Sequence, residues 1–210
     1  MRRLLLASAS PRRRELIVGL THDFDVLAPD VNEAIDDAVP AADAVRLLSQ
    51  RKAEAALERE PDRLILAADT LVSLGERLFG KPDGADAARD ALRGLRDRWH
   101  SVSTGFCFAG PGTREQDVVT TRVLMRALSD TEIEDSIRSG APFDKAGAYA
   151  IQDPVLRPVT RIDGCYCNVM GLPLWDVWRT LTPHGLVLRR PDETRTECRS
   201  CPRRATMPTA

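Results

Sequence analysis

An acid inside a predicted buried strand and a lysine on a constrained turn are the first candidates for chemistry in this chain. Asp69 is embedded in an apolar run that begins at Leu64 and is typical of a strand buried on both faces. A buried carboxylate is costly unless it is paired, hydrogen-bonded or metal-bound. Pro82 biases the preceding Lys81 towards an extended conformation. Asp69 and Lys81 could therefore meet in one cleft as base and cation; alternatively, Asp69 caps a turn and Lys81 is a solvated loop charge.

Serine hydroxyls and three arginines crowd the start of a predicted helix. Ser10 is its predicted N-cap, Ser8 lies just before it, and Arg12, Arg13 and Arg14 fall in the first turn. Cations at this end oppose the helix dipole, so acids would serve a purely structural helix better. The pattern favours a bound polyanion such as a phosphate chain. A solvated basic face is the alternative.

Three further side chains could complete such a site. Glu33 lies in an acidic loop and could supply a hard oxygen ligand to Mg²⁺ or Mn²⁺. Lys52 lies near the apolar face of a predicted helix over 40–57, where a lysine usually extends to water. Gln152 ends the small-residue-rich segment 144–152 and has the donor and acceptor needed to bind the edge of a base. The alternatives are a solvated acidic loop and a surface glutamine.

The chain has five cysteines, an odd number, and no recognisable secretory signal, which predicts reduced thiols and a cytoplasmic location. Cys198-x-x-Cys201 has the spacing of half a zinc site. The second half could only be Cys165-x-Cys167, whose one-residue spacing would place both side chains on one face of a strand. That is not the usual spacing of a zinc site, so the sequence argues against structural zinc.

The elements that must position these residues are mixed without strict alternation. Strands are predicted over 3–7, 24–27, from 64, and over 99–109, 118–128 and 155–162. Helices are predicted from 11, over 40–57, from a cap at Asp83 to 95, from 129, and, after a turn at 171–174, to about 181. We expect an α/β or α+β fold with a long, mixed, twisted sheet flanked by helices and a cleft. The folded domain is expected over residues 1–188, and the Pro-, Thr- and Arg-rich segment 189–210 is expected to be a mobile tail.

Charge and hydropathy exclude some partners. The 30 basic and 31 acidic residues nearly cancel, so no global field would attract nucleic acid or a membrane surface. No apolar run approaches the roughly 20 residues of a membrane span. Any anion site must therefore be local.

Five ordered segments carry a resemblance to a known family. They are Leu6–Leu16, Ala68–Thr70, Gly80–Pro82, Asp144–Gln152 and Asn168–Leu174. Together they resemble the Maf family, described as septum-formation inhibitors and understood as nucleoside triphosphate pyrophosphatases. The resemblance implies a fold like that of the inosine triphosphate pyrophosphatases, with two lobes around a deep cleft. It also implies hydrolysis between the α and β phosphates, with a divalent metal, Mg²⁺ or Mn²⁺.

The resemblance also assigns roles. Asp69 matches the family's proposed proton acceptor, and the Ala-Asp-Thr branch resembles the dTTP/UTP pyrophosphatases, in which the positions of Arg12, Thr70 and Gln152 are associated with substrate choice. Attack of water on the α phosphorus needs a base, a metal and cations that stabilise the leaving pyrophosphate. The predicted set is catalytic Asp69 and Lys81; substrate-binding Ser8, Arg12, Arg13, Lys52, Thr70, Lys145 and Gln152; and metal-binding Glu33 and Asp69.

Base preference and biological role keep alternatives open. Asp153-Pro154 follows Gln152 where the family more often has Gly, so the adjoining loop is expected to be stiffer. One alternative is a purine-preferring enzyme for 7-methyl-GTP or inosine triphosphate; another is a nucleotide-sensing regulator of septum formation without turnover. The family implies a role in cell division arrest or nucleotide-pool cleaning. The expected partner is the nucleoside triphosphate, with a homodimer left open.

Overall fold

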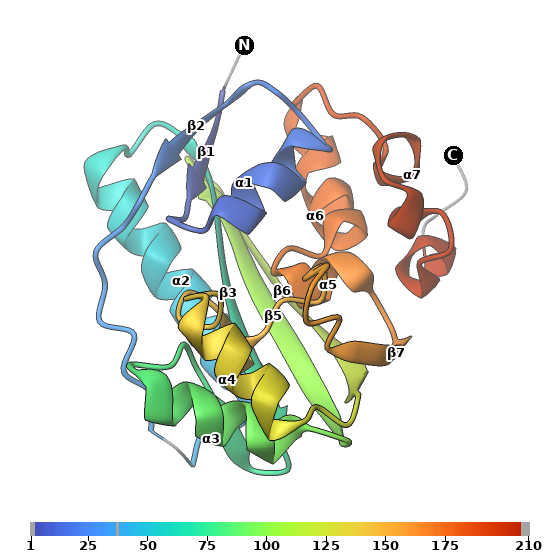
Figure 1. Ribbon diagram of the computed structural model, residues 1–210. Helices are drawn as coiled ribbons and strands as arrows, with labels where there is room; N and C mark the ends of the chain where they lie inside the picture. Colours follow the sequence, from blue (N-terminus) through green and yellow to red (C-terminus); the bar gives the residue numbers. More distant parts are fainter. Residues whose placement is uncertain (1–2, 37, 207–210) are drawn as a thin grey trace.

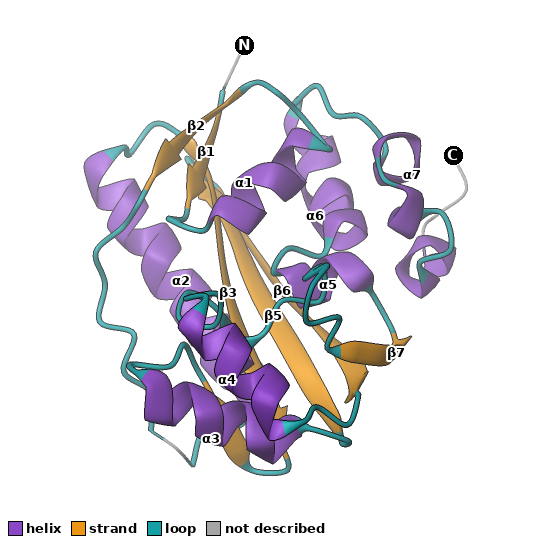
Figure 2. Cartoon of the chain, in the orientation of Figure 1, coloured by secondary structure: helices purple, strands orange, loops and turns teal. Residues whose placement is uncertain are grey.

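A seven-stranded mixed sheet forms the centre of the computed structural model, which describes residues 3–36 and 38–206 (Figures 1 and 2). The strands are β1 (Leu4–Ala7), β2 (Phe24–Leu27), β3 (Leu64–Leu74), β4 (Arg77–Phe79), β5 (Trp99–Gly110), β6 (Thr113–Met125) and β7 (Val159–Asp163). Their order is β2-β1-β3-β5-β6-β7, and β4 pairs with the distal part of β3. β1 is parallel to β2 and β3, whereas the other pairs are antiparallel. The predicted mixed α/β sheet is confirmed.

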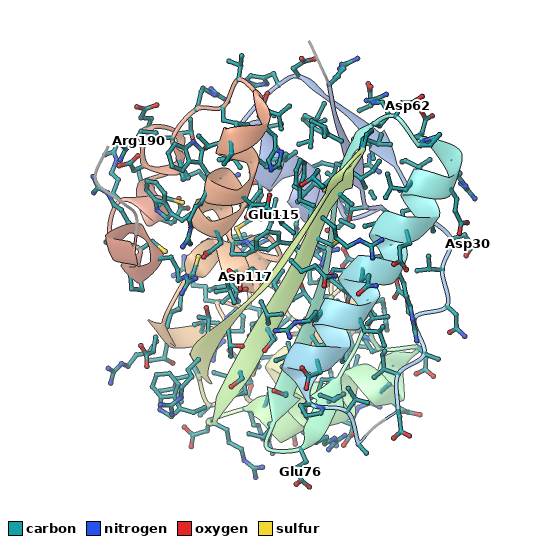
Figure 3. The ribbon with its side chains drawn as sticks, turned by 180° about the vertical axis from the view of Figure 1, so that it is seen from behind. Asp30, Asp62, Glu76, Glu115, Asp117 and Arg190 are labelled. Carbon is teal, nitrogen blue, oxygen red and sulfur yellow. The ribbon has the colours of Figure 1, made fainter. Side chains whose placement is uncertain are left out.

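Helices cover both faces of this sheet. They are α1 (Pro11–Val18), α2 (Ala41–Arg59), α3 (Ala85–Leu95), α4 (Asp130–Arg138), α5 (Tyr166–Met170), α6 (Leu174–Leu181) and α7 (Pro191–Thr194). Short 3₁₀ turns lie at Ala146–Ala148, Thr182–His184, Thr196–Cys198 and Pro202–Thr206. In the view from behind, α2 crosses the sheet alone (Figure 3), while the other helices lie on the opposite side (Figure 1). Within residues 3–36 and 38–206, no helix is both long and apolar enough to span a bilayer.

The burial of β3 explains its uninterrupted apolar sequence. Leu64, Leu66 and Ala68 pack in a cluster with α1 and α6, whereas Ile65 and Ala67 pack in a cluster with α2. Alternate side chains of a strand point to opposite faces, so both faces here need apolar residues. The predicted buried strand is therefore confirmed.

Two helix starts follow their sequence signals. The Ser10 hydroxyl accepts a hydrogen bond from the Arg13 backbone N–H at 3.4 Å, at the predicted start of α1. Ser129 and Glu132 form the predicted capping box of α4. A serine that accepts from a free N–H of the first turn removes one of the unsatisfied donors of a helix end.

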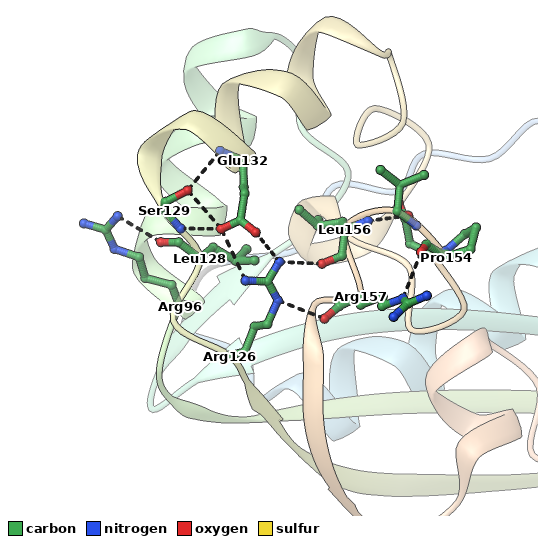
Figure 4. Close-up of polar contacts among 10 residues, drawn as sticks. Arg96, Arg126, Leu128, Ser129, Glu132, Pro154, Leu156 and Arg157 are labelled. Carbon is green, nitrogen blue, oxygen red and sulfur yellow. Dashed lines mark hydrogen bonds and ion pairs between the residues drawn. The ribbon is translucent and has the colours of Figure 1, made fainter.

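Arg126, at the end of β6, ties α4 to the loop that follows Gln152 (Figure 4). Its guanidinium binds both carboxylate oxygens of Glu132, at 2.5 and 3.2 Å. It also donates to the backbone carbonyls of Leu156 and Arg157, at 2.7 and 3.2 Å. A bidentate guanidinium contact fixes orientation as well as distance. The capping box and the 153–158 loop are thus held as one unit.

Several elements differ from the sequence predictions. α3 begins at Ala85 with Gly84 as its N-cap, so Asp83 lies outside the helix. The strand predicted over 155–162 is confined to β7, because the residues before it form turns. α5 was not predicted, since five residues are too few to show a helical period.

The C-terminal segment, expected to be a mobile tail, contains secondary structure over residues 191–206. Residues 191–206 form α7 and two 3₁₀ turns that pack on the main core, with Cys198 only 1% exposed. The Trp175 indole N–H donates to the Cys198 carbonyl at 3.0 Å, and the Arg195 guanidinium pairs with Glu15 at 2.7 Å. Composition suggested disorder because this segment has few apolar residues, but buried cysteines supply its apolar anchors. Residues 207–210 lie outside the described part.

Candidate functional site

A cavity of about 340 Å³ opens where β1 ends beside β3. All ten residues predicted from the sequence line it: Ser8, Arg12, Arg13, Glu33, Lys52, Asp69, Thr70, Lys81, Lys145 and Gln152. Its walls include Ile151 and Met170 of the cluster around α1 and α6, and Val72 and Tyr149 of the cluster around α3 and α4. The cavity therefore lies between two packed lobes. The chemical roles of the ten residues stay predictions.

The strand order explains why a cavity can form here. β1 pairs with β3 only as far as Ala7 opposite Ala67, and β4 joins the same edge of β3 only from Val72. In the described part of the chain, no strand pairs with the intervening residues on this edge. Asp69 and Thr70 lie within that interval, so neighbouring side chains of opposite orientation can both border the cavity.

Lys52 joins the two predicted metal-binding carboxylates. Its Nζ forms a short ion pair with Oδ1 of Asp69 and lies 2.7 Å from Oε1 of Glu33. Lys52 and Asp69 are each only 7% exposed. The expectation that Lys52 extends to water is therefore wrong, because two carboxylates offset the cost of burying its charge. Partial burial raises the pKa of Glu33, but the hydrogen bond and charge of Lys52 outweigh this, so its pKa is lowered overall.

A chain of hydrogen bonds fixes the proton of the Thr70 hydroxyl. Arg13 Nη2 donates to Thr70 Oγ1 at 2.9 Å, and Thr104 Oγ1 donates to the Asn168 carbonyl at 2.9 Å. Since the Thr104 proton is used there, the 2.9 Å contact between the two threonines requires Thr70 to donate. The Thr70 hydroxyl can therefore only accept a hydrogen bond from a bound molecule and cannot donate one.

Arg13, predicted to bind substrate, donates several hydrogen bonds within the protein. Its Nε donates to the Gly171 carbonyl at 2.8 Å and its Nη1 to Ser8 Oγ at 3.4 Å, in addition to the Thr70 contact. Burial lowers the pKa of Arg13, while the charge of Asp69 opposes that shift. Three of its five N–H donors are thus used by the protein. Arg13 positions the residues around it, and its binding of substrate stays a prediction.

Asp144 is a polar cavity residue that the sequence analysis did not assign. Its carboxylate pairs with Arg12 at 2.8 Å and with Lys145 at 2.5 Å. Partial burial raises the pKa of Asp144, but hydrogen bonds from Lys145 and Arg12 outweigh it and lower that pKa overall. An ionised Asp144 therefore holds both cations at the cavity wall. The available signal was an acid directly before Lys145 in a segment rich in small residues.

The segment carrying Lys81 meets a second motif through the backbone. The Gly147 N–H donates to the Gly80 carbonyl at 3.1 Å. Gly147 has a φ of 68°, and a Cβ there would lie 2.9 Å from a Val72 methyl. Glycine avoids both costs. This contact helps to place the exposed Lys81 side chain at the mouth of the cavity.

Gln152 is exposed at the cavity rim, followed by a hydrogen-bonded turn. Asp153 Oδ1 accepts from the backbone N–H groups of Val155 and Leu156, both at 2.9 Å. Together with the Arg126 contacts, this turn supports the expectation of a stiff loop beyond Gln152.

The carboxylates suit a hard divalent cation. Mg²⁺ is commonly held by one or two protein carboxylates, with water and substrate phosphates completing its shell. Glu33 and Asp69 provide two carboxylates on the cavity wall. Over residues 3–36 and 38–206, no group of three or more Cys, His, Asp or Glu side chains is arranged as a metal site. The residues present therefore fit a cation that is bound together with substrate.

Comparison with known proteins identifies the family of this chain. A family model described as Maf-like protein matches residues 3–184. The chain belongs to the Maf family. Three relatives are each named dTTP/UTP pyrophosphatase. The protein of Thermomicrobium roseum is 46% identical over 202 residues, covering 95% of this chain and 93% of its own. Those of Chlorobaculum parvum and Salinibacter ruber are 42% and 43% identical and cover 87% and 85% of this chain, and 94% and 89% of their own.

The Thermomicrobium roseum alignment bears on the C-terminal segment of this Maf-family chain. It leaves out about 5% of 210 residues, or about 10 residues, fewer than the 22 residues from 189 to 210. The similarity therefore reaches beyond residue 188 into the segment expected to be a tail.

Proposed function

We propose that this chain is a nucleoside triphosphate pyrophosphatase that hydrolyses dTTP and UTP to the monophosphate and pyrophosphate. The relatives named dTTP/UTP pyrophosphatase support this substrate class, since they align over most of both chains. The observation that carries the proposal is one cavity in which ionisable acids and several cations come together. A triphosphate substrate requires this combination.

Asp69 acts on the attacking water in this proposal. Its carboxylate is nearly buried and is held by Lys52, so its orientation is fixed before substrate enters. A positioned carboxylate can accept a proton from water or orient the water for attack on the α phosphorus. When a divalent cation is bound by Glu33 and Asp69, it supplies charge stabilisation to the phosphate oxygens.

The cations around the cavity bind the triphosphate. Arg12, Lys52, Lys81 and Lys145 all line the cavity, and Arg12 and Lys145 lie together around Asp144. Negative charge grows on the leaving pyrophosphate as the bond to the α phosphorus breaks, so fixed cations near it lower the barrier. Arg12 and Lys145 already face one anion, the Asp144 carboxylate, so this part of the cavity lining is arranged for negative charge.

Base selection is assigned to Thr70 and Gln152. The Thr70 oxygen can only accept a further hydrogen bond, whereas the Gln152 amide both donates and accepts. Thymine and uracil present an N–H donor between two carbonyl acceptors, which complements this combination. Cytosine presents an acceptor at the corresponding ring nitrogen and is expected to bind less well.

The test is pyrophosphate and monophosphate release from dTTP, UTP, CTP, dGTP, ITP and 7-methyl-GTP, with Mg²⁺ or Mn²⁺. We expect turnover of dTTP and UTP, lost on chelation, and a decrease in kcat of about 10²- to 10⁴-fold in Asp69→Asn. Asp62→Asn is the matched control, because Asp62 is exposed in the turn between α2 and β3 (Figure 3).

Contrary outcomes separate the alternatives. Preference for 7-methyl-GTP or ITP would favour the purine enzyme, and nucleotide binding without release of pyrophosphate would favour the sensor. A fully active Asp69→Asn variant would remove Asp69 from catalysis. The choice between Mg²⁺ and Mn²⁺, a cytoplasmic location, a homodimer and a role in cell division stay predictions.

A further inference from the structure

Four of the five cysteines come together outside the lining of the catalytic cavity. We call Cys165, Cys167, Cys198 and Cys201 the cysteine cluster. All four are free thiols with exposed fractions of 1–7%, and all belong to the core cluster around α1 and α6. None lines the cavity. The first two lie at the start of α5 and the last two in the C-terminal segment, so the cluster joins parts of the chain more than 30 residues apart.

The sulfur contacts pair one cysteine of each segment with one of the other. Cys167 Sγ lies 3.5 Å from Cys198 Sγ. Cys165 has the Cys201 side chain as its neighbour. In a tetrahedral zinc site with Zn–S bonds of about 2.3 Å, neighbouring sulfurs are about 3.8 Å apart. The observed 3.5 Å is close to that sulfur–sulfur distance and well beyond the roughly 2.05 Å of a disulfide bond.

Polar groups around the cluster suit thiolate ligands. The backbone N–H of Asn168 lies beside the Cys165 sulfur, and the backbone N–H of Arg203 lies beside the Cys201 sulfur. The Arg195 guanidinium is a positive charge near Cys167. Four thiolates around Zn²⁺ leave a doubly negative centre, and N–H donors and nearby cations stabilise such a centre.

The local conformation removes the objection drawn from the sequence. That objection assumed that Cys165 and Cys167 lie on one strand. In the structure Cys165 is the N-cap of α5, with φ −101° and ψ 118°, and Cys167 lies in the first helical turn. The chain changes from extended to helical between them, and each sulfur contacts one member of the Cys198-x-x-Cys201 pair.

We propose that the cysteine cluster is a structural zinc site that fastens the C-terminal segment to α5 and α6. In the structure the thiols stand as two pairs, and the described residues contain no group of three ligands already arranged around one point. Binding therefore draws the two pairs together and releases the four thiol protons to solvent as four Zn–S bonds form. Tetrahedral sulfur coordination selects zinc over the hard cations expected in the catalytic cavity.

The test uses the full chain, purified without chelator and dialysed against Mg²⁺. Elemental analysis is expected to find one zinc per chain in the wild type and none in Cys198→Ser/Cys201→Ser. Cys107→Ser is the matched control, since Cys107 is equally buried but packs with α2, and it should keep its zinc. A strong chelator should lower the Tm of the wild type and leave that of the double variant unchanged.

Cobalt substitution decides the matter even if the double variant fails to fold. Co²⁺ in the wild type should give the sulfur-to-metal charge-transfer bands and intense visible bands of a tetrahedral thiolate site. The catalytic cavity is lined by carboxylates and by no cysteine thiol, so it cannot produce the thiolate charge-transfer bands. Wild-type protein without zinc or these bands, with all five thiols free, would overturn the proposal. So would two disulfides pairing Cys165 with Cys201 and Cys167 with Cys198.

Discussion

Removing Lys52 should destabilise the fold much more than removing another lysine of the same cavity. Lys52→Met leaves the Asp69 carboxylate nearly buried without its ion-pair partner. Breaking a buried pair by removing one member costs about 3–5 kcal/mol, mainly because the remaining charge is desolvated. The Glu33 contact adds little, since the Glu33 side chain is 50% exposed. For a chain of this length, we expect the Tm to fall by about 10 °C.

The assay is urea unfolding followed by tryptophan fluorescence, which reports on the buried Trp175. Lys81→Met is the matched control, because Lys81 is exposed and should change the unfolding free energy by less than about 0.5 kcal/mol. In Lys52→Met/Asp69→Asn the uncompensated charge is absent, so a large part of the stability should return. The two single changes should therefore be strongly non-additive.

Two results would refute this reasoning. If Lys52→Met were as stable as Lys81→Met, Lys52 would not be compensating a buried charge. The second is additivity of the two changes. If Asp69→Asn lowered the unfolding free energy by the same amount in Lys52→Met as in the wild type, the two side chains would be energetically independent.

Two further predictions concern stability. Burial lowers the pKa of His100 to about 4. Below about pH 6.5 the unfolded chain therefore binds a proton at His100 that the folded chain excludes. The free energy of unfolding should fall by about 3 kcal/mol between pH 6.5 and pH 4. His100→Gln should flatten that part of the pH–stability curve and the exposed His22→Gln should not; equal slopes would contradict the assignment. Gly105→Ala would place a Cβ 2.5 Å from the Val45 carbonyl oxygen of α2 and should cost about 1–3 kcal/mol in urea unfolding. Gly80→Ala is the control, because open space surrounds the Cβ position at Gly80. Equal stability of the two variants would show that α2 moves away from the new methyl group at no cost in unfolding free energy.

Features set by neighbouring residues could be predicted from the sequence. The Ser10 cap of α1, the capping box of α4 and the buried character of β3 depend on short patterns, and the structure confirms all three. The residues that line the cavity could also be predicted from the sequence, because residue types suited to phosphate chemistry occur in motifs that resemble one family. All ten predicted residues line the cavity, although their chemical roles stay predictions.

The contacts between these residues depended on tertiary structure. The burial of Lys52 follows from the position of α2 over β3, and the use of the Arg13 donors follows from the approach of Gly171. Asp144 joins cations from two distant segments. Such contacts require strand order and helix placement, which local periodicity does not specify.

The C-terminal segment shows the same division most clearly. The sequence by itself determined that it has few apolar residues and one Cys198-x-x-Cys201 pair, a composition typical of a tail. Only the folded chain brings that pair against Cys165 and Cys167 at the start of α5. The physical reason is that burial and sulfur contacts arise between segments that are remote along the chain, so the free energy that orders the segment cannot be assigned from its own residues.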